Sequence, residues 1–333
     1  MVGSVNRRDG DAMKSALTID DNRFEPIRGL IVMSAATLLM PVMDSMAKVL
    51  GVFFDFPAAE ITLGRFVFQA MLTVPILFLI EGARGFRIDR PLMNIVRGSF
   101  VGAGSVLFFA SLKFMPLADA IAVFFVEPFI LTILSAIFLK EKIGWHRSMS
   151  VVMGFFGAVL VIQPSFAVFG VVSLYPLGTA TLFAFYLLLS RQLGTSGSAL
   201  AMQLYAGIGG AGVVLVIMLF GTAAGLRELT FTVPETPVIW LLLASVGLAG
   251  LVSHFLATFA FQLAPASLLA PLQYLEIISA TLLGLLIFGE APNALSWLGI
   301  VIVVASGIYL FWREQKVARR KPVAIPDKPW QAP

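Results

Sequence analysis

Ten apolar runs of about 20 residues follow one another along this chain, and they limit its possible folds more than any other feature of the sequence. Most of the runs end at a short polar or Gly/Pro-containing break. A helix needs about 20 apolar residues to cross a bilayer core of ~30 Å, and it satisfies its own backbone hydrogen bonds there. The runs predict transmembrane helices near residues 29–48, 57–80, 93–114, 118–139, 149–163, 170–190, 199–220, 237–262, 265–288 and 294–312.

Composition supports an all-helical, multi-pass membrane protein and excludes other classes. Hydrophobic residues make up 59% of the chain and charged residues 13%, which is more apolar surface than a soluble fold can bury. The chain has no cysteine and two histidines, so we expect no disulfide, no metal site and no cofactor. A net charge of +4 is too small to indicate nucleic acid as a partner.

The distribution of Lys and Arg predicts the orientation, because these residues accumulate on the cytoplasmic side of membrane helices. With ten helices and both termini in the cytoplasm, 19 of the 23 basic residues fall on that side. We therefore expect a bacterial inner-membrane protein. Residues 1–28 are interpreted as a solvated cytoplasmic tail rather than a cleavable signal peptide, and residues 313–333 as a basic cytoplasmic tail.

An internal repeat relates the two halves of the chain. Residues 112–141 can be aligned with residues 261–290 at an offset of 149, which pairs Pro116 with Pro265, Glu127 with Glu276, and Glu141 with Glu290. The expected copies are residues 29–163 and 170–312, with five helices each. An odd number of helices per copy makes the two copies run in opposite directions across the membrane. Such inverted repeats are typical of secondary transporters that alternate access around a central site.

The chain resembles the EamA-type members of the drug/metabolite transporter superfamily over roughly residues 28–312. The resemblance rests on LGRF, which contains Arg65, on LSAIFLKEKIGW with Glu141, and on LLGLLIFGEAPNALSWLGIVIVVASG with Glu290. It implies ten helices in two five-helix repeats and a transport function. Within the family, PLADAIAVFFVEPFILT is most similar to bacterial riboflavin uptake members.

Three charged residues lie near the middle of apolar runs. Glu127, Glu276 and Arg65 are each about 12–16 Å from a membrane face at 1.5 Å per residue. Charges at that depth are costly and usually face the interior of the helix bundle. We predict that the two glutamates line a central cavity and that one of them couples proton or solute binding to the change of access. The alternative is an Arg65–Glu127 pair that only joins two helices.

Other residues near this layer are candidates for substrate contact. Pro128 should kink its helix and release the carbonyl of Phe124 close to Glu127. Gln273 and Tyr274 lie within one turn of Glu276 and are the stronger candidates for binding. The weaker candidates are Gln69, Phe108, Phe109, Gln203, Tyr205 and His254.

Several motifs are better explained by structure than by chemistry. Gly98 and Gly102 form a GxxxG spacing that allows close helix contact. Asp44 and Lys48 are four residues apart and are interpreted as an i,i+4 pair. Glu141 and Glu290 occur at the ends of spans, where they would cap, pair or form part of a gate.

These features predict a secondary carrier of a small organic metabolite, with riboflavin uptake as the leading hypothesis from the resemblance. Export of amino acids or related metabolites, or carriage of S-adenosylmethionine, is the alternative. An enzyme is disfavoured because no recognisable catalytic motif occurs. A channel is disfavoured by the glutamate layer. The bilayer and the substrate are the expected partners, and the sequence leaves homodimer formation open.

Overall fold

The computed structural model describes residues 25–138, 140, 145–193, 196–264 and 269–320, and these residues include helices but no β-strand. Each helix is apolar over most of its length and satisfies its backbone hydrogen bonds internally, as a segment that spans a bilayer must. The α-helices are α2 (Glu25–Phe53), α3 (Ala58–Glu81), α4 (Pro91–Leu112), α5 (Leu117–Phe124), α6 (Glu127–Phe138), α7 (Trp145–Phe169), α8 (Tyr175–Leu193), α9 (Ala199–Ala223), α10 (Pro237–Leu263), α12 (Leu275–Leu283) and α13 (Ala294–Arg320). Short 3-10 segments are η2 (Gly82–Phe86), η3 (Gly170–Leu174), η4 (Arg227–Leu229) and η5 (Ala270–Tyr274), and η6 (Gly284–Phe288) is a π-helix.

Eight segments in the described part of the chain are long and apolar enough to cross a membrane. Two shorter apolar helices, Ser148–Gln163 and Leu272–Phe288, lie in the fifth and ninth expected spans. Large apolar side chains such as Leu79 and Leu286 are 82% and 79% exposed on the outside of the bundle, where lipid would cover them. The chain is therefore a multi-pass helical membrane protein.

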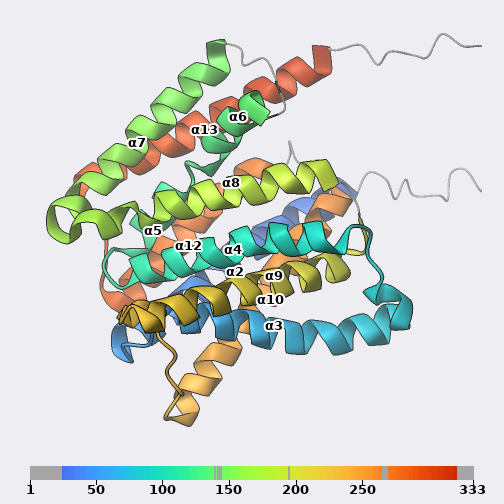
Figure 1. Ribbon diagram of the computed structural model, residues 1–333. Coiled ribbons are helices and arrows are strands. Elements are labelled where there is room, and N and C mark those ends of the chain that lie inside the picture. The colour runs from blue at the N-terminus through green and yellow to red at the C-terminus, as the bar shows by residue number, and fades with distance from the viewer. Residues whose placement is uncertain (1–24, 139, 141–144, 194–195, 265–268, 321–333) are drawn as a thin grey trace, which may run out of the picture.

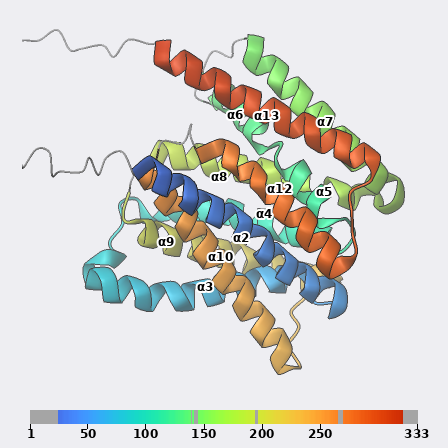
Figure 2. The same cartoon turned by 180° about the vertical axis from the view of Figure 1, so that it is seen from behind.

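The helices pack in one bundle, with one pair set to the side. α7 and α13 lie side by side along the upper edge of Figure 1, and the reverse view in Figure 2 shows the same pairing. In the main body α2 packs on α10, and α4 packs on both α8 and α9. Segments far apart in the sequence thus enclose the centre of the bundle.

Two of the expected spans are interrupted. The fourth consists of α5 and α6, which are separated at residues 125–126, and Pro128 lies in the first turn of α6. The ninth changes from the 3-10 segment η5 to α12 and then to the π-helix η6. Broken helices at membrane depth are tolerated where their backbone is buried in protein or lines a cavity. Three other helices extend well beyond the expected spans, since α2 covers Glu25–Phe53, α7 continues to Phe169 and α13 to Arg320.

Small residues allow α4 and α9 to approach closely, as the GxxxG spacing predicts. A β-carbon added to Gly98 would lie 2.0 Å from the carbonyl oxygen of Ala206. One added to Gly102 would lie 2.6 Å from Gly210 Cα. Such contact of two backbones maximises van der Waals packing where lipid gives no hydrophobic driving force.

Candidate functional site

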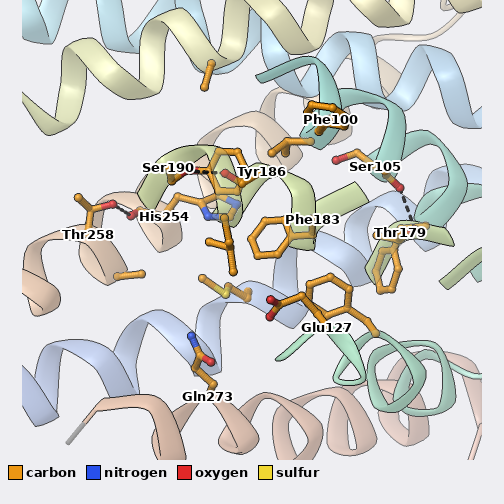
Figure 3. Close-up of a pocket in the computed structure, with 18 of the residues that line it drawn as sticks. Phe100, Ser105, Glu127, Thr179, Phe183, Tyr186, Ser190, His254, Thr258 and Gln273 are labelled. Atoms are coloured by element: carbon orange, nitrogen blue, oxygen red, sulfur yellow. Dashed lines mark hydrogen bonds between the residues drawn. The ribbon is translucent and has the colours of Figure 1, made fainter. Parts of the chain in front are cut away.

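A cavity of about 570 Å³ lies inside the bundle, between helices of the first and second halves of the chain. This volume falls within the range of small-molecule sites, about 300–1,000 Å³. Its wall is mainly aromatic and apolar, with a few charged and polar side chains. Figure 3 shows the Glu127 carboxylate directed into this space, with Phe183, Tyr186 and His254 on the facing wall and Gln273 on its other side.

The cavity extends from the middle of the bundle toward one end only. Its lining includes the beginning of α9, from Ala199 to Gly207, and the end of α10, from His254 to Phe261. At the other end α2 finishes and α3 begins, and the deepest lining residue on α2 is Asp44. We call these the cavity end and the closed end.

Arg65 lines the cavity from α3, but it does not pair with either glutamate. Its guanidinium donates to Ser105 Oγ at 2.9 Å and lies 2.8 Å from His254 Nε2. Because a guanidinium has only donors, Nε2 of His254 accepts this hydrogen bond, and the neutral ring carries its proton on Nδ1. Arg65 therefore connects three helices through neutral partners, and among its hydrogen bonds to described residues none goes to Glu127, the partner expected in the alternative.

The two glutamates occupy matching places at the interruptions of their spans. Glu127 is the first residue of α6 and Glu276 the second residue of α12, and each is 8% exposed and lines the cavity. A carboxylate in the first turn of a helix interacts favourably with the unpaired N–H groups there. The breaks thus place two acidic groups beside the cavity.

The remaining predicted site residues divide between the cavity and its surroundings. Phe124, Pro128 and Gln273 line the cavity, and the Phe124 ring packs edge-on against Phe108 and Phe183. Tyr274 does not line it. Its ring packs against Phe125 at 5.1 Å between centroids, and a β-carbon at Gly307 would overlap its hydroxyl.

Among the weaker candidates, Gln69, Phe108, Phe109, Gln203 and His254 line the cavity. Tyr205 instead donates to the carbonyl of Phe86 at 3.1 Å. Glu141 lies outside the described residues.

The sequence did not reveal Asp44 or the contribution of α8 to the cavity. Asp44 lines it from α2 and is 4% exposed. Its signal in the sequence is a charge inside an apolar run, and pairing with Lys48 accounts for such a charge without a role in binding. From α8 come Thr179, Phe183, Tyr186 and Ser190, and ordinary helix composition gives no sign of them.

The interpretation of Asp44 and Lys48 as an i,i+4 pair is wrong. The ammonium of Lys48 donates to both oxygens of Glu290, at 2.5 and 2.6 Å, and to the carbonyl of Met115 at 2.9 Å. Lys48 is 2% exposed, and the backbone N–H of Leu117 also donates to Glu290, at 3.4 Å. Glu290 pairs with Lys48 because it lies two residues after the end of η6, where it reaches α2 at the closed end.

A second group of charges lies at the same closed end, nearer the surface. Lys113 donates to Asp55 at 3.1 Å and to Glu228 at 2.5 Å, and Arg227 also pairs with Asp55. The hydrogen bond from Lys113, aided by the positive charges of Lys113 and Arg227, holds the pKa of the Asp55 carboxyl below its usual value. These contacts connect the loop between α2 and α3 to the ends of α4 and α9.

Within the described ranges no group of three or more His, Asp or Glu side chains has the geometry of a metal site.

A bundle of membrane helices that encloses a cavity of solute size, closed at one end by ion pairs, defines a membrane transport protein. The chain belongs to the EamA-like transporter family, whose model matches residues 27–163 and again residues 170–312.

Named relatives are similar over nearly the whole chain. A riboflavin transporter of Vibrio cholerae is 26% identical over 90% of this chain and 98% of its own length. An S-adenosylmethionine uptake transporter of Rickettsia bellii is 27% identical over 84% of this chain and 91% of its own length. A solved crystal structure that is 15% identical superposes with a TM-score of 0.57 over 87% of this chain and 98% of that chain, which supports the fold alone.

Proposed function

We propose that the protein is a ten-helix secondary carrier in which two inverted five-helix repeats alternate access to the central cavity. The packing supports a two-fold relation between α2–α7 and α8–α13. α2 packs on α10 as α8 packs on α4, and α12 packs on α2 as α6 packs on α8. α7 packs on α13, its counterpart in the other repeat. Symmetric repeats of this kind give a carrier two equivalent ways to close.

In this proposal both termini are cytoplasmic and the membrane is the bacterial inner membrane. The basic residues of the tails and loops support that orientation. The cavity end then faces the cytoplasm, and the Lys48–Glu290 pair closes the outer side. Glu290 would be part of the outer gate, and Glu141, at the equivalent place in the first repeat, part of the inner gate.

The cargo we propose is a small metabolite with a planar ring system, and riboflavin uptake is the first candidate. The observation that carries the proposal is the cavity of about 570 Å³ between the two repeats, with Phe108, Phe124 and Phe183 available for stacking. S-adenosylmethionine, the cargo named for other relatives, is the second candidate and also contains a planar base.

Glu127 and Glu276 are the residues we propose for coupling or binding. Both are buried in the cavity wall at the breaks of their spans, where a change of helix geometry would move them. Arg65, held by Ser105 and His254, would supply a fixed positive charge on the facing wall. Phe124, Gln273 and Tyr274 complete the proposed site, with Tyr274 supporting it from behind.

The test is uptake of radiolabelled riboflavin by cells that cannot synthesise it and that express this chain. We expect saturable uptake by the wild type and loss of uptake to background in a Glu127→Gln, Glu276→Gln double variant. Glu60→Gln is the matched control. Glu60 is a buried carboxylate outside the cavity lining whose oxygen accepts from Thr232 N at 2.7 Å, a bond that Gln can keep. Well-expressed wild-type protein without uptake would exclude riboflavin as the cargo.

A further inference from the structure

Two carboxylates, Asp44 and Glu276, face the cavity without a partner. Asp44 is 4% and Glu276 8% exposed, and neither makes a hydrogen bond or ion pair with any described residue. They come from opposite repeats, on helices that pack directly, since Ser279 Oγ donates to the carbonyl of Leu38 at 2.8 Å. Their charges are close enough to interact with each other. Two buried carboxylates that accept no hydrogen bond form a site that a positively charged group would complete.

The cations of the surrounding wall do not fill this site. Arg65 lies close enough to attract Asp44 through space and so offsets part of its negative charge, but its N–H groups donate to Ser105 and His254 and not to either carboxylate. Arg97 donates to Met202 O at 3.2 Å and Ser190 Oγ at 3.4 Å, nearer the cavity end. The third nearby cation, Lys48, is used by Glu290 at the closed end. One positive charge against two carboxylates leaves a negative charge that a cation entering the cavity could neutralise.

A neutral residue in the same wall points to the same kind of ligand. Gln69 lines the cavity, is 5% exposed, and its amide oxygen has no hydrogen-bond partner in the part of the chain that the structure describes. A buried acceptor without a donor is costly to leave in that state. The ring of Phe108 lines the cavity too, and aromatic faces attract cations, as the Arg65 guanidinium over the Phe66 ring at 5.3 Å illustrates.

We propose that Asp44 and Glu276 together form the subsite that receives a positively charged group of the cargo, such as a sulfonium. This inference rests on the proposed carrier function and narrows its substrate class. It reverses the order of the two candidate cargos, because it favours a cationic metabolite, of which S-adenosylmethionine is an example, over riboflavin, which is neutral. Because the subsite joins α2 of one repeat to α12 of the other, a cation bound there would contact both moving units.

The experiment compares two probes of nearly the same shape. S-adenosylmethionine carries a sulfonium, whereas S-adenosylhomocysteine lacks one methyl group and that positive charge. Binding of each is measured to the purified full-length protein in detergent. We expect the wild type to bind S-adenosylmethionine about tenfold or more tightly than S-adenosylhomocysteine, since a charge-assisted contact is being gained. In Asp44→Asn and Glu276→Gln the preference should vanish, and Glu60→Gln should keep it.

The outcomes separate this inference from the proposed function. A wild type that binds both probes equally, or neither, overturns the cationic subsite without use of any variant, and so does preserved preference in Asp44→Asn. If Asp44→Asn does not affect riboflavin uptake, the proposed carrier function then holds with a neutral cargo. If the carboxylates instead serve a coupling proton or Na⁺, the probes bind alike and Asp44→Asn abolishes the pH or Na⁺ dependence of uptake, which also overturns the inference.

Discussion

Buried charges are paired at the closed end of this transporter, whereas two buried carboxylates in its cavity accept no hydrogen bond from the described residues. At the closed end, Lys48 and Glu290 neutralise each other and are supplied with backbone partners. In the cavity, Asp44 and Glu276 are more deeply buried than Glu290 but lack such partners among the described residues. The cavity wall is instead held by glycine contacts between α4 and α9. Ion pairs thus hold the helices together at the closed end. Around the cavity, close packing of small residues does so, and the carboxylates stay unpaired there.

The largest expected effect comes from removing one member of the closed-end pair. Glu290→Gln leaves the Lys48 ammonium 2% exposed without a carboxylate. Breaking a buried pair in this way typically costs about 3–5 kcal/mol. We expect a clear fall in the thermal midpoint of the purified protein. Adding Lys48→Met should recover part of that loss, because no uncompensated charge then remains, and an additive loss in the double variant would contradict the pairing.

A smaller effect is expected where α9 contacts α4. A β-carbon at Gly209 would lie 1.9 Å from the carbonyl oxygen of Ile95, whereas one at Gly212 has no atom within 4 Å. Gly209→Ala should destabilise the protein by about 1–3 kcal/mol through overpacking. Gly212→Ala, the matched control on the same helix, should be neutral or stabilising by up to about 1 kcal/mol. Equal thermal midpoints for the two variants would show that the contact is not needed.

The smallest effect concerns the exposed pair at the closed end. Asp55 has a lowered pKa in the folded protein because Lys113 donates to it. Its contribution to stability is therefore complete above its ordinary pKa of about 3.9 and disappears as the pH falls through its lower folded value. Asp55→Asn should lower the thermal midpoint slightly at pH 7 and by progressively less as the pH falls below 3.8, as exposed pairs contribute about 0.2–1 kcal/mol. A constant offset at every pH would reject this cause.

The sequence predicted the multi-pass helical fold but not all of the contacts in the cavity. The length of an apolar run locates a membrane helix regardless of its neighbours, and the GxxxG spacing in α4 predicts close contact with another helix. By contrast, the partner of Lys48 lies 242 residues away at Glu290, so only the packed bundle reveals it. For the same reason the direction of Tyr274 could not be predicted, since it depends on Gly307 of α13. Glu127, Glu276 and Arg65 line one cavity, while their role in transport stays a prediction.

The π-helix η6, which ends the ninth span, positions Glu290 to contact Lys48 at the closed end. η6 leads into Gly289, whose φ of +67° only glycine adopts without cost, and the N–H of Glu290 then bonds back to the carbonyl of Gly284 at 3.0 Å. A regular α-helix advances each residue by about 100°, so deleting one residue of η6 would rotate Glu290 by about that angle away from Lys48. The extra residue in the π-helical turn thus determines which side chain of the ninth span faces Lys48 of the first span.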